Sequence, residues 1–170
     1  MSEIKHQRSA VANRNMKSNQ RGWHERLTSK SRGGIRINSA KDLTVYRTAY
    51  QLAMEIFELS KHFPAEEKFA LTTQIRRSSR SICLNLREAW AKRRYEAHFV
   101  SKLTDCDGEN SEIDSSLDFA RSCRYISADE HQVLVNKCAE IGRMLNGMMQ
   151  KSRLIPCPRL KDWQFLRAGP

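Results

Sequence analysis

The sequence lacks the features that mark membrane-bound and exported proteins. No apolar run approaches the roughly 20 residues that cross a bilayer, and the first residues contain no apolar signal segment. The five cysteines are odd in number, and no two of them have the close spacing of a zinc or redox motif (Cys83, Cys106, Cys123, Cys138, Cys157). We therefore expect a cytoplasmic protein that does not contact membranes. Its cysteines should be reduced, with at least Cys83, Cys106 and Cys138 inside helices.

Motifs of common active sites and metal centres are also missing. The chain has no glycine-rich phosphate loop, no nucleophile elbow and no Cys/His pair with catalytic spacing. A di-iron centre in a helical bundle needs two Glu-x-x-His motifs, but His62, His98 and His131 each lack a glutamate three positions earlier. We therefore expect no metal, no cofactor and no enzymatic activity.

Positive charge is abundant but unevenly distributed. The net charge of +11 and the pI of about 9.8 would suit a polyanionic partner if the charge were spread evenly. Residues 1–40 contain nine Lys and Arg against two Asp and Glu, residues 41–155 contain eighteen against sixteen, and residues 156–170 contain three against one. The middle of the chain is therefore almost balanced, and most of the excess belongs to its two ends.

Residues 1–40 show no helical or strand period and are rich in Ser, Asn, Arg and Gly. This composition predicts a disordered basic tail. Three interpretations remain open: a solvated tail, a segment upstream of the true start of translation, or an arm that contacts nucleic acid through its phosphates. Residues 156–170 are predicted to be a C-terminal tail.

Between residues 41 and 155, apolar positions recur in steps of three and four in four segments, the pattern of bundle helices. The predicted buried positions are Val45, Ala49, Leu52, Ile56, Leu59 and Phe63; Thr72, Ile75, Ser79, Ile82, Leu86 and Ala89; Phe99, Leu103, Cys106, Asn110, Ile113, Leu117 and Ala120; and Leu134, Cys138, Ile141, Leu145 and Met148.

Breaks between these segments follow from local chemistry. Pro64 must end the first segment, Glu66 and Glu67 suit the start of the second, and Ser127 with Glu130 forms a capping box for the fourth. Pro156 and Pro158 would end the fourth segment. With short connections and no strand pattern, residues 41–155 are predicted to form an all-α, antiparallel, up-down four-helix bundle.

The second segment carries many basic residues for a helix with a buried side. They are Arg76, Arg77, Arg80, Arg87, Lys92, Arg93 and Arg94. At about 100° per residue, Arg76, Arg80, Arg87 and Arg94 fall on one strip beside the buried positions, whereas the other three lie off it. With Trp90 and Tyr95 nearby, this surface is suited to follow a phosphate backbone and to stack on a base.

A second interpretation is ion pairing. The third segment places Asp105, Glu109 and Glu112 on one face, and arginine binds carboxylate through two parallel hydrogen bonds. The two segments can therefore pair within a chain or across a subunit interface, and the balanced charge of residues 41–155 favours this pairing. Asn110 at a buried position, and Asn85 beside one, are expected to fix helix register or oligomeric state.

Three short motifs, FP at 63–64, QIRR at 74–77 and SICLN at 81–85, followed by Glu88, occur in a recognisable order. In this respect residues 42–153 resemble the bacterial four-helix-bundle proteins encoded in intervening sequences of large-subunit ribosomal RNA genes. That family includes the accessory variability protein of diversity-generating retroelements. The chain departs from the family pattern at Cys83, where many members have proline, and at Arg87 and Ala89, which indicates a continuous and more basic second helix.

The resemblance implies a homo-oligomer, with a ring-like pentamer as the expected form, and no enzymatic activity. In retroelement members the basic ring looks suited to binding RNA or DNA beside a reverse transcriptase, so RNA, DNA and a reverse transcriptase or another protein are the partners that the resemblance suggests here. Our leading expectation is therefore a non-enzymatic, nucleic-acid-binding oligomer in which the seven basic residues of the second segment contact phosphates. The alternative is a structural or protein-interaction scaffold whose arginines form ion pairs between helices or subunits.

Overall fold

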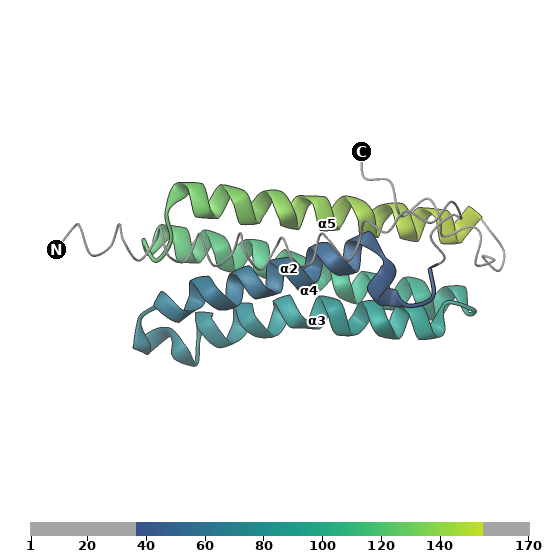
Figure 1. Cartoon of the computed structure of the whole chain (residues 1–170), viewed down its shortest axis with the longest axis horizontal. Coiled ribbons are helices and arrows are strands. Elements are labelled where there is room, and N and C mark those ends of the chain that lie inside the picture. Colours follow the sequence, from purple (N-terminus) through teal and green to yellow (C-terminus); the bar gives the residue numbers. More distant parts are fainter. Residues whose placement is uncertain (1–36, 155–170) are drawn as a thin grey trace, which may run out of the picture. The chain divides into compact units, whose positions relative to one another are not determined.

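The computed structural model describes residues 37–154, and Figure 1 shows that their four long helices form a bundle. The helices are α2 (Thr44–Leu59), α3 (Leu71–Lys92), α4 (Glu96–Ser122) and α5 (Ala128–Leu154). No strand occurs within residues 37–154. The chain reverses direction between successive helices, so the predicted all-α, up-down bundle is confirmed. The continuous second helix is confirmed as well, because α3 runs unbroken through Arg87 and Ala89.

The core contains the residues that the three-and-four spacing predicts. The largest side chains with almost no exposure include Leu52, Ile75, Phe99 and Ile141, one from each helix. Burying one such side chain stabilises the fold by about 1.5–3 kcal/mol. Among the predicted core positions, Leu59 alone is only half-buried.

Three cysteines lie in this core. Burial raises the pKa of Cys83 to about 11 and that of both Cys106 and Cys138 to about 12. These three are free and buried, as predicted, whereas Cys123 is free and exposed. Cys157 lies outside the described residues.

Asn110 is buried between α4 and α5. Its Nδ2 donates a hydrogen bond of 3.0 Å to the Cys138 carbonyl, while its Oδ1 has no hydrogen-bond partner among residues 37–154. Gly142 lies opposite, where an added Cβ would come 3.6 Å from Asn110 Nδ2. An unpaired buried amide oxygen costs stability. The buried position of Asn110 is confirmed, and its role in fixing helix register or oligomeric state stays a prediction.

The connection from α2 to α3 is longer than the sequence indicates. Two short 3-10 helices, η3 (Ser60–His62) and η4 (Ala65–Lys68), flank Phe63 and Pro64. As a result α3 begins at Leu71, later than the predicted start at Glu66 and Glu67. Glu67 still occupies the positive end of α3, because its Oε2 accepts a hydrogen bond of 3.3 Å from the Leu71 N–H.

Capping contacts end α4 and begin α5. The predicted capping box is present: Ser127 N–H donates to Glu130 Oε2 at 2.8 Å, and Glu130 N–H donates to Ser127 Oγ at 3.2 Å. Just before it, Arg124 has a φ of 60°. The Arg124 and Tyr125 N–H groups donate to the carbonyls of Arg121 and Ala120. This is the Schellman motif, in which glycine is the preferred residue at the position of Arg124.

The bundle begins a few residues earlier than predicted. Ile37 and Ala40, which the sequence places in the N-terminal tail, are buried against the core. Ser39 and Asp42 form a capping box for the 3-10 helix η2 (Ala40–Asp42). The other predictions for the tails, including the helix end at Pro156 and Pro158, concern residues 1–36 and 155–170, which lie outside the described residues.

Within residues 37–154, no helix combines the length and the apolar character that a membrane span requires.

We predict that Arg124→Gly stabilises the protein, because a non-glycine residue at positive φ is strained by about 1–2 kcal/mol. Glycine also increases the entropy of the unfolded chain, which offsets part of this gain. The free energy of unfolding in urea should therefore rise by about 0.5–1 kcal/mol. Arg124→Ala removes the same side chain without relieving the strain, so an equal gain in that variant would contradict this explanation.

Candidate nucleic-acid interface

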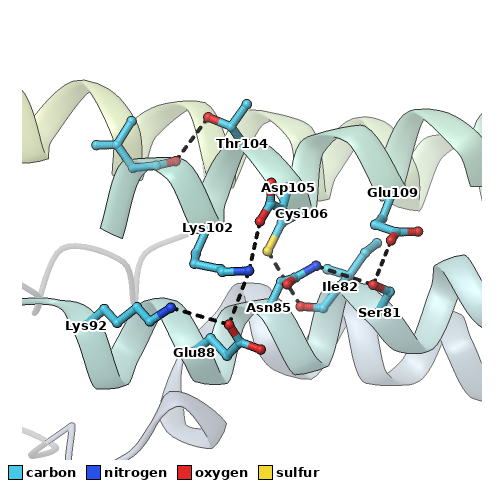
Figure 2. A network of polar contacts seen from close by, with 11 residues as sticks. Ser81, Ile82, Asn85, Glu88, Lys92, Lys102, Thr104, Asp105, Cys106 and Glu109 are labelled. Carbon is cyan, nitrogen blue, oxygen red and sulfur yellow. Dashed lines mark hydrogen bonds and ion pairs between the residues drawn. The ribbon is translucent and has the colours of Figure 1, made fainter. Parts of the chain in front are cut away.

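A row of polar contacts joins α3 to α4 beside the core. Gln74 Nε2 and Ser78 Oγ both donate to Glu112 Oε2, at 2.7 and 2.6 Å, and Ser81 Oγ donates to Glu109 Oε1 at 2.7 Å. We call this row, with the lysine cluster described next, the α3–α4 polar seam. Part of it is visible in Figure 2, where Ser81 and Glu109 point toward each other.

The seam continues into an ion cluster toward the end of α3 (Figure 2). Lys102 lies 3.0 Å from Asp105 and 3.2 Å from Glu88, and Glu88 also lies 3.7 Å from Lys92. Hydrogen bonds from Lys102 to Asp105 and Glu88 raise its pKa. The charge of Lys92, one of the predicted phosphate contacts, is therefore partly balanced within the chain.

These contacts correct the ion-pair prediction. Asp105, Glu109 and Glu112 bind a lysine, serines and a glutamine instead of the arginines of α3. Within residues 37–154, no arginine nitrogen lies within 4 Å of a carboxylate oxygen. The prediction of arginine–carboxylate pairing inside one chain is therefore wrong, because the face of α3 that meets α4 carries Gln74, Ser78 and Ser81, and the arginines lie elsewhere around the helix.

Arg76 and Arg80 lie beside α2. Arg76 Nε donates a hydrogen bond of 2.7 Å to Ser60 Oγ, and its guanidinium group lies 5.0 Å from the centre of the Phe57 ring. The guanidinium group of Arg80 lies 5.8 Å from the same ring. Each such cation–π contact at an exposed site contributes about 0.5–1 kcal/mol, and it leaves the positive charge uncompensated.

Arg87 also lies beside α2, but near the N-terminal end of that helix, where it interacts with Tyr46. Burial and the neighbouring Cys83 raise the pKa of Tyr46, while the charge of Arg87 and its hydrogen bond to the hydroxyl act in the opposite direction. The groups that contact Arg76, Arg80 and Arg87 are therefore all uncharged. We call the surface formed by Arg76, Arg80 and Arg87 of α3 with Tyr46, Tyr50 and Phe57 of α2 the arginine face.

The remaining predicted residues lie elsewhere. Arg77 is exposed, about 100° further around α3 than Arg76. Because α3 ends at Lys92, Arg93 and Arg94 lie in the turn that follows, and Arg94 is exposed. Arg93 donates a hydrogen bond of 2.7 Å to the Trp90 carbonyl.

Trp90 does not fit its predicted role as a stacking platform. It is only 9% exposed, and the Arg93 guanidinium group lies 4.4 Å from the centre of its ring. Tyr95 is 67% exposed and meets His98 edge-on, with ring centres 6.1 Å apart, so it remains accessible.

Sequence reasoning missed the α2 side of the arginine face. Tyr46, Tyr50 and Phe57 recur at steps of four and seven, one position away from the buried positions Val45, Ala49 and Ile56. These residues therefore lie about 100° further around α2 than the buried positions, on the side where Phe57 meets Arg76 and Arg80. This regular spacing of aromatic residues was the signal available in the sequence.

Possible metal ligands are not brought together in the part of the chain that the structure describes, where no three His, Cys, Asp or Glu side chains form a suitable group.

Comparison with known proteins assigns the family. The model of the 23S rRNA-intervening sequence protein family matches residues 41–147. A solved structure from Bacteroides thetaiotaomicron, described as a protein of unknown function from the S23 ribosomal protein family, is 29% identical, with a TM-score of 0.57. The match covers 62% of this chain and 95% of that one. No curated protein matches. The chain belongs to the 23S rRNA-intervening sequence protein family.

We predict that Glu112→Ala destabilises the protein by about 1–2 kcal/mol, because Ser78 and Gln74 lose their shared acceptor and Ser78 is fully buried. The free energy of unfolding in urea measures this loss. Glu66→Ala removes an exposed glutamate from η4 and serves as the control. Equal stability of the two variants would show that the seam contributes nothing to folding.

Proposed function

We propose that this member of the 23S rRNA-intervening sequence protein family is a non-enzymatic, oligomeric protein that binds RNA or DNA on its arginine face. The observation that carries the proposal is the set of partners of Arg76 and Arg80. A serine hydroxyl and an aromatic ring hold these side chains in place, and no carboxylate neutralises them within the described chain. Fixed positive charges of this kind attract phosphate and lose little side-chain entropy on binding.

The charges of α3 and α4 give the two sides of the bundle opposite signs. Between Leu71 and Lys92, α3 carries five basic residues and one acidic residue, whereas α4 carries seven acidic and two basic residues between Glu96 and Ser122. The α3 side of the bundle therefore attracts a polyanion, and the α4 side repels it. Contacts to phosphates alone bind without reading base sequence.

A homo-oligomer, with the pentameric ring implied by the family resemblance, would present several arginine faces to one nucleic-acid chain. The second and later contacts then form at high effective concentration, so weak single sites give strong overall binding. We also retain a reverse transcriptase or another protein as a proposed partner in the same complex.

The second candidate is a scaffold in which the arginine face binds carboxylates of a neighbouring subunit. The unneutralised charge of Arg76 and Arg80 favours this function too, since arginine is well suited to ion pairs at interfaces. The two functions predict different effects of removing these charges. If the face binds nucleic acid, the affinity for nucleic acid falls; if it binds a neighbouring subunit, the oligomeric mass falls.

We predict that the double variant Arg80→Glu with Arg87→Glu binds an RNA oligonucleotide more weakly and with a smaller dependence on salt. Loss of two phosphate contacts should lower the slope of log affinity against log salt by about 1.4–1.8. The measurement is fluorescence anisotropy on the full chain across a salt series, with light scattering on the same samples.

The matched control is Arg121→Glu with Arg143→Glu, which changes the net charge equally at exposed positions of α4 and α5. If the two double variants lose equal affinity, the arginine face is not the binding surface. If Arg80→Glu with Arg87→Glu instead lowers the oligomeric mass, the scaffold function is supported.

A further inference from the structure

Apolar side chains are exposed on and around the arginine face. Tyr50 is 50% exposed, Met54 44% and Leu84 64%. Tyr50 and Met54 lie on α2, one turn apart, and Leu84 lies on α3 between Arg80 and Arg87. The phosphate backbone of a duplex offers these side chains no apolar partner, whereas the faces of unpaired bases do.

Contacts between α2 and α3 show where Tyr50 lies along these two helices. Arg87 interacts with Tyr46, and Arg76 and Arg80 lie beside Phe57, so α2 and α3 run past each other in opposite directions. Tyr50 comes one turn after Tyr46, and its hydroxyl is close enough to affect the pKa of Tyr46. The Tyr50 ring is therefore placed along the bundle between Arg87 and Arg80.

Tyr95 provides a similar ring at the far end of α3. It follows directly after Arg93 and Arg94 and is 67% exposed. From Arg76 to Lys92 the helix rises about 24 Å. A stacked strand rises about 3.4 Å per nucleotide, so this distance corresponds to about seven nucleotides.

We propose that the partner of the arginine face is single-stranded nucleic acid, with bases stacking on Tyr50 and Tyr95 while the arginines along α3 contact the phosphates of the same strand. This inference rests on the proposed function and specifies its substrate class. Aromatic side chains stack on any base, because every base has a π-face, so binding should tolerate changes of sequence. A duplex keeps its bases stacked inside, and the two tyrosines should contribute nothing to duplex binding.

The test compares a twelve-nucleotide single strand with the duplex of the same sequence, using the full chain and fluorescence anisotropy. Tyr50→Ala should weaken binding of the single strand about fivefold to 150-fold, the effect of losing one base–aromatic stack. Tyr50→Phe keeps the ring and should bind as the wild type does. Tyr95→Ala should weaken single-strand binding in the same range, and none of these variants should change duplex binding.

The outcomes separate this inference from the proposed function. Single-strand stacking is wrong if the wild type binds both forms equally, or if both alanine variants bind the single strand normally. In either case, salt-dependent binding that requires Arg80 and Arg87 would still support a phosphate-binding face. If neither form binds, or if binding does not depend on those arginines, both proposals fail.

Discussion

Three uncharged side chains of α3 donate hydrogen bonds to two glutamates of α4, and these bonds fix how α3 is rotated against α4. Serines at positions 78 and 81 reach the carboxylates only if their side of the helix faces α4. That rotation directs the arginine strip toward α2 and solvent. The carboxylates of α4 are thus satisfied without using the arginines, and the positive charge of α3 remains on the surface.

The position of each arginine then depends on α2. Phe57 lies beside two guanidinium groups, and Ser60, at the end of α2, accepts a hydrogen bond from Arg76. Neutral partners limit the number of conformations that these long side chains adopt without cancelling their charge. The fold therefore provides an ordered, positively charged surface that includes exposed aromatic rings, which is the combination that single-stranded nucleic acid binds.

The buried side of each helix could be predicted from the sequence, because positions such as Phe99 and Ile113 recur with the helical period and burial follows from that period alone. The partners of Glu109 and Glu112 could not be predicted, because opposite charge suggests arginine, whereas serine and glutamine side chains of α3 donate the hydrogen bonds. The start of α3 at Leu71 was also missed, since the 3-10 turn of η4 follows Pro64 and delays the helix. The connection that contains η3 and η4 returns α3 to the side of α2, where Arg76 contacts Ser60 and Phe57.

Chemical modification of arginines with phenylglyoxal, read by mass spectrometry with and without a single-stranded oligonucleotide, tests the central claim most directly. The account predicts that Arg80 and Arg87 react in the free protein and are protected by the oligonucleotide, while Arg121 and Arg143 react equally in both states. Protection of Arg80 and Arg87 in the free protein would show that another subunit covers them. Full reactivity in the presence of a bound oligonucleotide would show that nucleic acid binds elsewhere, and either result would contradict the account.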